Sequence, residues 1–124
     1  MSARTLIQTQ LVALLPKTYR VVPIEKRVGS ITRRPVVVIR QKATRPAPEG
    51  IGFFLVDLTL TVATPITNLD AAEDALDDIL VDIDTALAKV PWVRWTDATK
   101  VIYQDMYPAL DFTLEAVTQR KATP

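Results

Sequence analysis

A chain of 124 residues, of which 48% are hydrophobic and 23% charged, has the size and composition of an ordinary globular protein, and we expect one domain over residues 1–124. The sequence contains neither cysteine nor histidine, which excludes disulfides, Ser-His-Asp and Cys-His catalysis and most zinc sites. No apolar run approaches the roughly 20 residues of a membrane helix, and the start lacks the layout of a signal peptide. We therefore expect a soluble protein that is not exported.

The net charge of +1 conceals two segments of opposite sign. Residues 1–45 hold ten Lys and Arg against one acid, Glu25, whereas residues 46–91 hold nine acids against one base, Lys89. Opposite charges arranged in this way can neutralise each other within one molecule or between copies of it.

The first predicted element is a helix over residues 3–15. Its apolar residues recur at helical spacing, and Pro16 is a stop signal. A short strand is expected over 19–23. The segment 24–34 that follows is polar, basic and contains a glycine, which is typical of a loop or hairpin tip.

Two further strands are predicted near the middle of the chain. Residues 36–42 are rich in β-branched side chains, and residues 54–63 alternate between apolar and polar. The alternation predicts one face toward a core and one polar face. The polar face carries Asp57, Thr59 and Thr61. Two prolines and a glycine predict a loop over 43–50.

The clearest helix is predicted over 69–90, where the apolar residues form one stripe. Asp70 and Glu73 have the spacing of a capping box, which predicts Asp70 as the N-cap. Strands follow over 93–103 and 109–117, with Asp97 interrupting the first of them. The turn between them is expected to involve the aromatic and proline residues Tyr103, Tyr107 and Pro108.

The element order α-β-β-β-α-β-β predicts an α+β fold, in which a mostly antiparallel sheet of four to five strands packs against two helices. Strands that follow one another without intervening helices favour antiparallel pairing, and helices then cover one face of the sheet.

The predicted helix over 69–90 carries the main cluster of carboxylates. Asp70, Asp74, Asp77 and Asp78 lie at spacings that place several of them on one solvated face. A calcium or two-metal site needs oxygen ligands that converge, which one helix face does not supply. The glycines also lack the spacing of a phosphate-binding loop. We expect no metal, no cofactor and no enzymatic activity, which leaves a solvated face or a contact between subunits.

The basic segment has its own alternatives. Arg27, Arg33 and Arg34 could contact phosphates, which would make the protein a nucleic-acid-binding accessory module. These arginines have no adjacent aromatic residues on which bases could stack, which favours solvated loop charges or contacts to an acidic neighbour. The two tryptophans, Trp92 and Trp95, are expected to pack in or around the core.

Several sequence segments resemble those of a known family. They are the helix ending LVALLPK, the basic loop, the Val-rich strand, the strand GFFLVDLTLTVATP, the acidic helix DAAEDALDDILVDIDTAL and the final strand LDFTLEAV. In this order they resemble a tail terminator, or tail-completion protein, of long-tailed bacteriophages (siphophages) that infect actinobacteria. The resemblance covers most of the chain and brings no catalytic motif with it.

The resemblance implies a structural virion protein at the head-proximal end of the tail, assembled in the host cytoplasm. Such a protein forms a hexameric ring that caps the tail tube, stops tail polymerisation and completes head-tail joining. Its partners would be other copies of itself, the tail tube protein and the head-tail connector protein, with no membrane. DNA would pass through the lumen without specific binding. A head-completion or connector protein is the neighbouring alternative within virion assembly.

In a ring of identical subunits, each contact joins two different patches. The candidate interface residues are therefore the bases and acids of the two oppositely charged segments. They are Arg27, Arg33 and Arg34 in the loop and Asp74, Asp77 and Asp78 on the helix.

Overall fold

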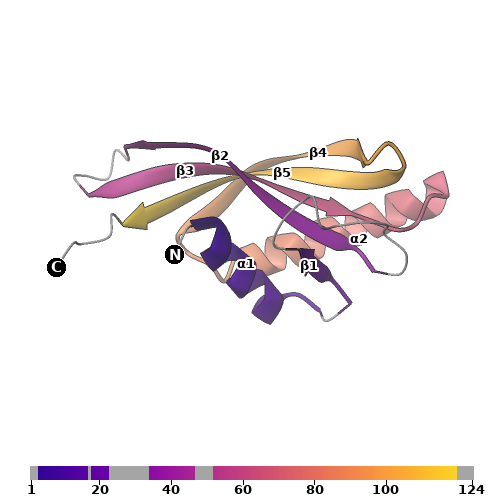
Figure 1. Cartoon of the computed structure of the whole chain (residues 1–124). Helices are drawn as coiled ribbons and strands as arrows, with labels where there is room; N and C mark the ends of the chain where they lie inside the picture. The colour runs from indigo at the N-terminus through magenta and orange to yellow at the C-terminus, as the bar shows by residue number, and fades with distance from the viewer. Residues whose placement is uncertain (1–2, 17, 23–33, 47–51, 120–124) are drawn as a thin grey trace.

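A computed structural model describes residues 3–16, 18–22, 34–46 and 52–119 (Figure 1). These residues form the helices α1 (Ala3–Leu14) and α2 (Leu69–Leu87). The strands are β1 (Arg20–Val22), β2 (Val36–Pro46), β3 (Phe53–Ala63), β4 (Val93–Tyr103) and β5 (Tyr107–Gln119). The predicted α+β class and the order α-β-β-β-α-β-β are confirmed.

The strands form one five-stranded sheet in the order β1-β2-β3-β5-β4. β1 pairs with β2 in parallel, and the other neighbours are antiparallel. Because β1 and β2 are parallel, these two strands do not form a hairpin with each other. The segment predicted as a loop or hairpin tip, residues 24–34, lies outside the described residues apart from Arg34.

Both helices lie on the same face of the sheet, with the N-terminus beside α1 (Figure 1). One continuous core fills the space between the helices and the sheet. Its fully buried members include Ile7 and Leu11 of α1, Ile83 of α2, Leu58 and Leu60 of β3, and Phe112 and Leu114 of β5. The apolar positions predicted from the helical period and from the strand alternation therefore pack against each other in this layer.

The opposite face of β3 is polar, as the alternation predicts, but part of it is buried. Thr59 and Thr61 are 5% and 2% exposed. Thr61 donates from Oγ1 to Asp111 Oδ1 at 2.5 Å and accepts from Arg40 Nη2 at 3.3 Å. β3 is the central strand, so side chains of β2 and β5 cover this face from both sides.

Three element boundaries also differ. α2 is capped by Asn68, whose side-chain oxygen accepts from the Ala71 amide at 3.2 Å, so the prediction of Asp70 as the N-cap is wrong. The helix ends at Leu87 instead of continuing to residue 90. β2 continues through a bulge between Gln41 and Ala43 as far as Pro46, because β3 offers it a pairing partner there. The predicted loop over 43–50 is thus partly strand.

The β4–β5 hairpin places its turn at Gln104 and Asp105, which have φ of 52° and 58°. Tyr107 and Pro108 accordingly belong to β5 and not to the turn. Asp97 marks a register shift after Trp95, which agrees with the predicted interruption. The Trp95 ring packs edge-on against Phe112, with ring centroids 5.6 Å apart, as core packing of the tryptophans predicts.

Phe112 tests the core. Phe112→Ala removes a fully buried ring and leaves a cavity, so we expect a loss of about 3–5 kcal/mol in unfolding free energy, measured by urea denaturation. The control Val12→Ala, at a residue 63% exposed on α1, should change it by less than about 0.5 kcal/mol. Equal effects of the two substitutions would contradict the described core.

Candidate functional site

The rotation of α2 about its axis is set by its apolar stripe. Ala72, Leu76, Ile79 and Ile83 are all buried against the sheet. The acids of α2 divide into two groups: acids that form a hydrogen bond or ion pair with another part of the chain, and exposed acids that form neither with the described residues.

The acids of the first group connect α2 to β4 on one side and to Tyr19 on the other. Glu73 pairs with Lys100 of β4, and Asp84 Oδ1 accepts from Trp95 Nε1 at 2.9 Å. On the other side, Asp82 Oδ2 accepts from the Tyr19 hydroxyl at 2.7 Å. These acids are structural, although sequence spacing alone does not distinguish them from the others.

Two pKa shifts follow from these contacts. Burial raises the pKa of Tyr19 far above its ordinary value, and the hydrogen bond to Asp82 and the charges of Asp82 and Asp78 add to the increase. The hydrogen bond to Glu73 raises the pKa of Lys100. Both groups therefore keep their protons at neutral pH.

The second group contains Asp70, in the first turn of the helix, and the three predicted candidates. Asp74, Asp77 and Asp78 are exposed. None of them forms an ion pair or hydrogen bond with the described part of the chain. Val81, 64% exposed, lies one turn further along, next to Asp77 and Asp78 on the helix surface. We call Asp74, Asp77, Asp78 and Val81 the outer face of α2.

Of the predicted basic candidates, only Arg34 lies within the described residues. It is exposed and lies at the start of β2, beside a groove of about 390 Å³ between α1 and β1. The groove is lined by Leu11 of α1, by Leu15 just after the helix, and by Arg20 and Arg34. The structure places Arg34 and the outer face of α2 on different elements. Arg27 and Arg33 lie outside the described residues.

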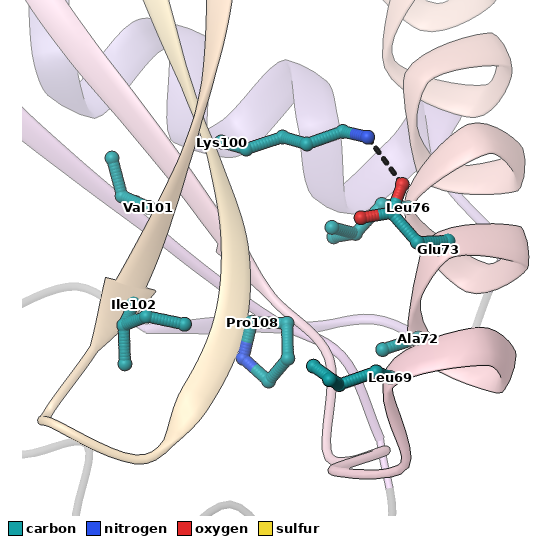
Figure 2. Close-up of a pocket in the computed structure, with 8 residues that line it drawn as sticks. All are labelled: Leu69, Ala72, Glu73, Leu76, Lys100, Val101, Ile102 and Pro108. Carbon is teal, nitrogen blue, oxygen red and sulfur yellow. Dashed lines mark hydrogen bonds and ion pairs between the residues drawn. The ribbon is translucent and has the colours of Figure 1, made fainter.

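A second hollow, of about 170 Å³, lies between the start of α2 and the C-terminal half of β4 (Figure 2). Figure 2 shows Leu69, Ile102 and Pro108 at one end, and Lys100 reaching across to Glu73 at the other. Leu69 and Ile102 are 76% and 60% exposed. The spacing of residues in the sequence does not predict this hollow, because only the packed structure brings residues 69–76 beside β4.

The sheet face that bears no helix carries a ladder of ion pairs. Arg45 pairs with Asp57 and, at 3.2 Å, with Glu115, which also accepts from Arg94 at 2.8 Å. Thr113 donates to Asp97 at 2.9 Å. These acids bond to neighbouring strands of the same chain, which distinguishes them from the outer face of α2.

Comparison with known proteins identifies no relative, because no protein-family model matches the chain and no curated protein matches its sequence. Within the described ranges, no group of three or more carboxylates is arranged to hold a metal ion. Neither described helix has the length and apolar character needed to cross a membrane. Any functional inference therefore depends on the surfaces described above.

Tyr19→Phe tests the α2 attachment. Removing the hydroxyl deletes a hydrogen bond to a charged partner, so we expect a loss of about 1–2 kcal/mol in unfolding free energy at pH 7. Because folding raises the pKa of Tyr19, the folded state keeps a proton that the unfolded state releases above about pH 10, and stability is lost as pH rises beyond that point.

The difference in unfolding free energy between wild type and Tyr19→Phe should therefore decrease between about pH 9 and pH 11, the titration range of a free tyrosine. Urea denaturation at several pH values provides the measurement. A constant difference across this range would contradict the contact between Tyr19 and Asp82.

Proposed function

We propose that this protein is a structural component of a bacteriophage tail, forming a hexameric ring that caps the tail tube, stops its polymerisation and joins the tail to the head connector. The chain acts without catalysis or cofactor. It binds other copies of itself first, and the ring then binds the tube protein on one side and the connector on the other, while DNA passes through the lumen.

The observation that supports this proposal best is the unpaired outer face of α2. Asp74 lies three and four residues before Asp77 and Asp78, and like charges at these spacings repel by a few tenths of a kcal/mol, about 0.2–0.5 per pair. The acids therefore cost the isolated chain stability. A contact with bases outside the molecule offsets that cost.

The separation of charge between elements is compatible with a ring. A two-fold axis through the outer face of α2 would bring that face against itself and place acid beside acid. A heterologous contact joins unlike patches, acidic on one copy and basic on the next, and rotation about a common axis closes it into a ring. Arg34 and the arginines of the preceding segment are the candidate bases.

The test reverses the charges of the candidate interface residues. Arg33→Glu/Arg34→Glu and, separately, Asp77→Lys/Asp78→Lys should each weaken self-association at low ionic strength, because exposed charge contacts are strongest where salt screens them least. Combining all four substitutions should restore part of the association. Sedimentation velocity at about 0.05 M and about 0.5 M salt, where the Debye length falls from roughly 14 to 4 Å, provides the measurement.

The control Thr9→Lys/Gln10→Lys adds positive charge at exposed positions of α1 and should leave association nearly unchanged. If neither reversal alters the sedimentation coefficient, these residues are not the interface. A steep salt dependence of DNA affinity that Arg27, Arg33 and Arg34 substitutions abolish would favour the nucleic-acid-binding alternative instead.

A further inference from the structure

We draw no further inference here: the strongest candidate, the exposed apolar surface of Leu69 and Ile102 over the hollow between the start of α2 and β4, carries none because nothing in the described part of the structure shows what covers it.

Discussion

Burial of the apolar stripe of α2 against the sheet determines where the charges of this protein lie. Each buried Leu or Ile side chain contributes about 1.5–3 kcal/mol, whereas an exposed ion pair contributes about 0–1 kcal/mol. Leu76, Ile79 and Ile83 therefore set the rotation of the helix, and the acids take whatever directions remain. The division into bonded and outward acids is a consequence of core packing.

Core packing therefore explains why the acids of α2 have two different environments. Asp82 and Asp84 fall on the flanks, where Tyr19, just before β1, and Trp95 of β4 donate hydrogen bonds to them. Asp77 and Asp78 are exposed and form no hydrogen bond or ion pair with the described residues, although the charge of Asp77 acts on Lys100 and that of Asp78 on Tyr19. The same packing brings Leu69 beside β4 and leaves an apolar hollow at an open edge of the sheet.

Periodicity was sufficient to predict the element order and most of the core, because burial on one face imposes a period of 3.6 on α2 and of 2 on β3. It did not predict that Thr59 and Thr61 are buried, since cover from β2 and β5 depends on strand order. Asn68 was missed as the N-cap because Asp70 and Glu73 offered an equally good local pattern. The sequence named the acids of the candidate site, but only the packed structure shows that Asp84 accepts a hydrogen bond from Trp95, whereas Asp77 has no hydrogen-bond partner among the described residues.

Association of unlike surfaces is the central claim, and the shape of the assembled protein tests it most directly. Negative-stain images and native mass spectrometry of the purified chain at low salt should give closed rings with a single mass, six times that of the 13.8 kDa subunit if the proposal is right. A strict monomer at high protein concentration, or a compact two-fold dimer, would contradict the account.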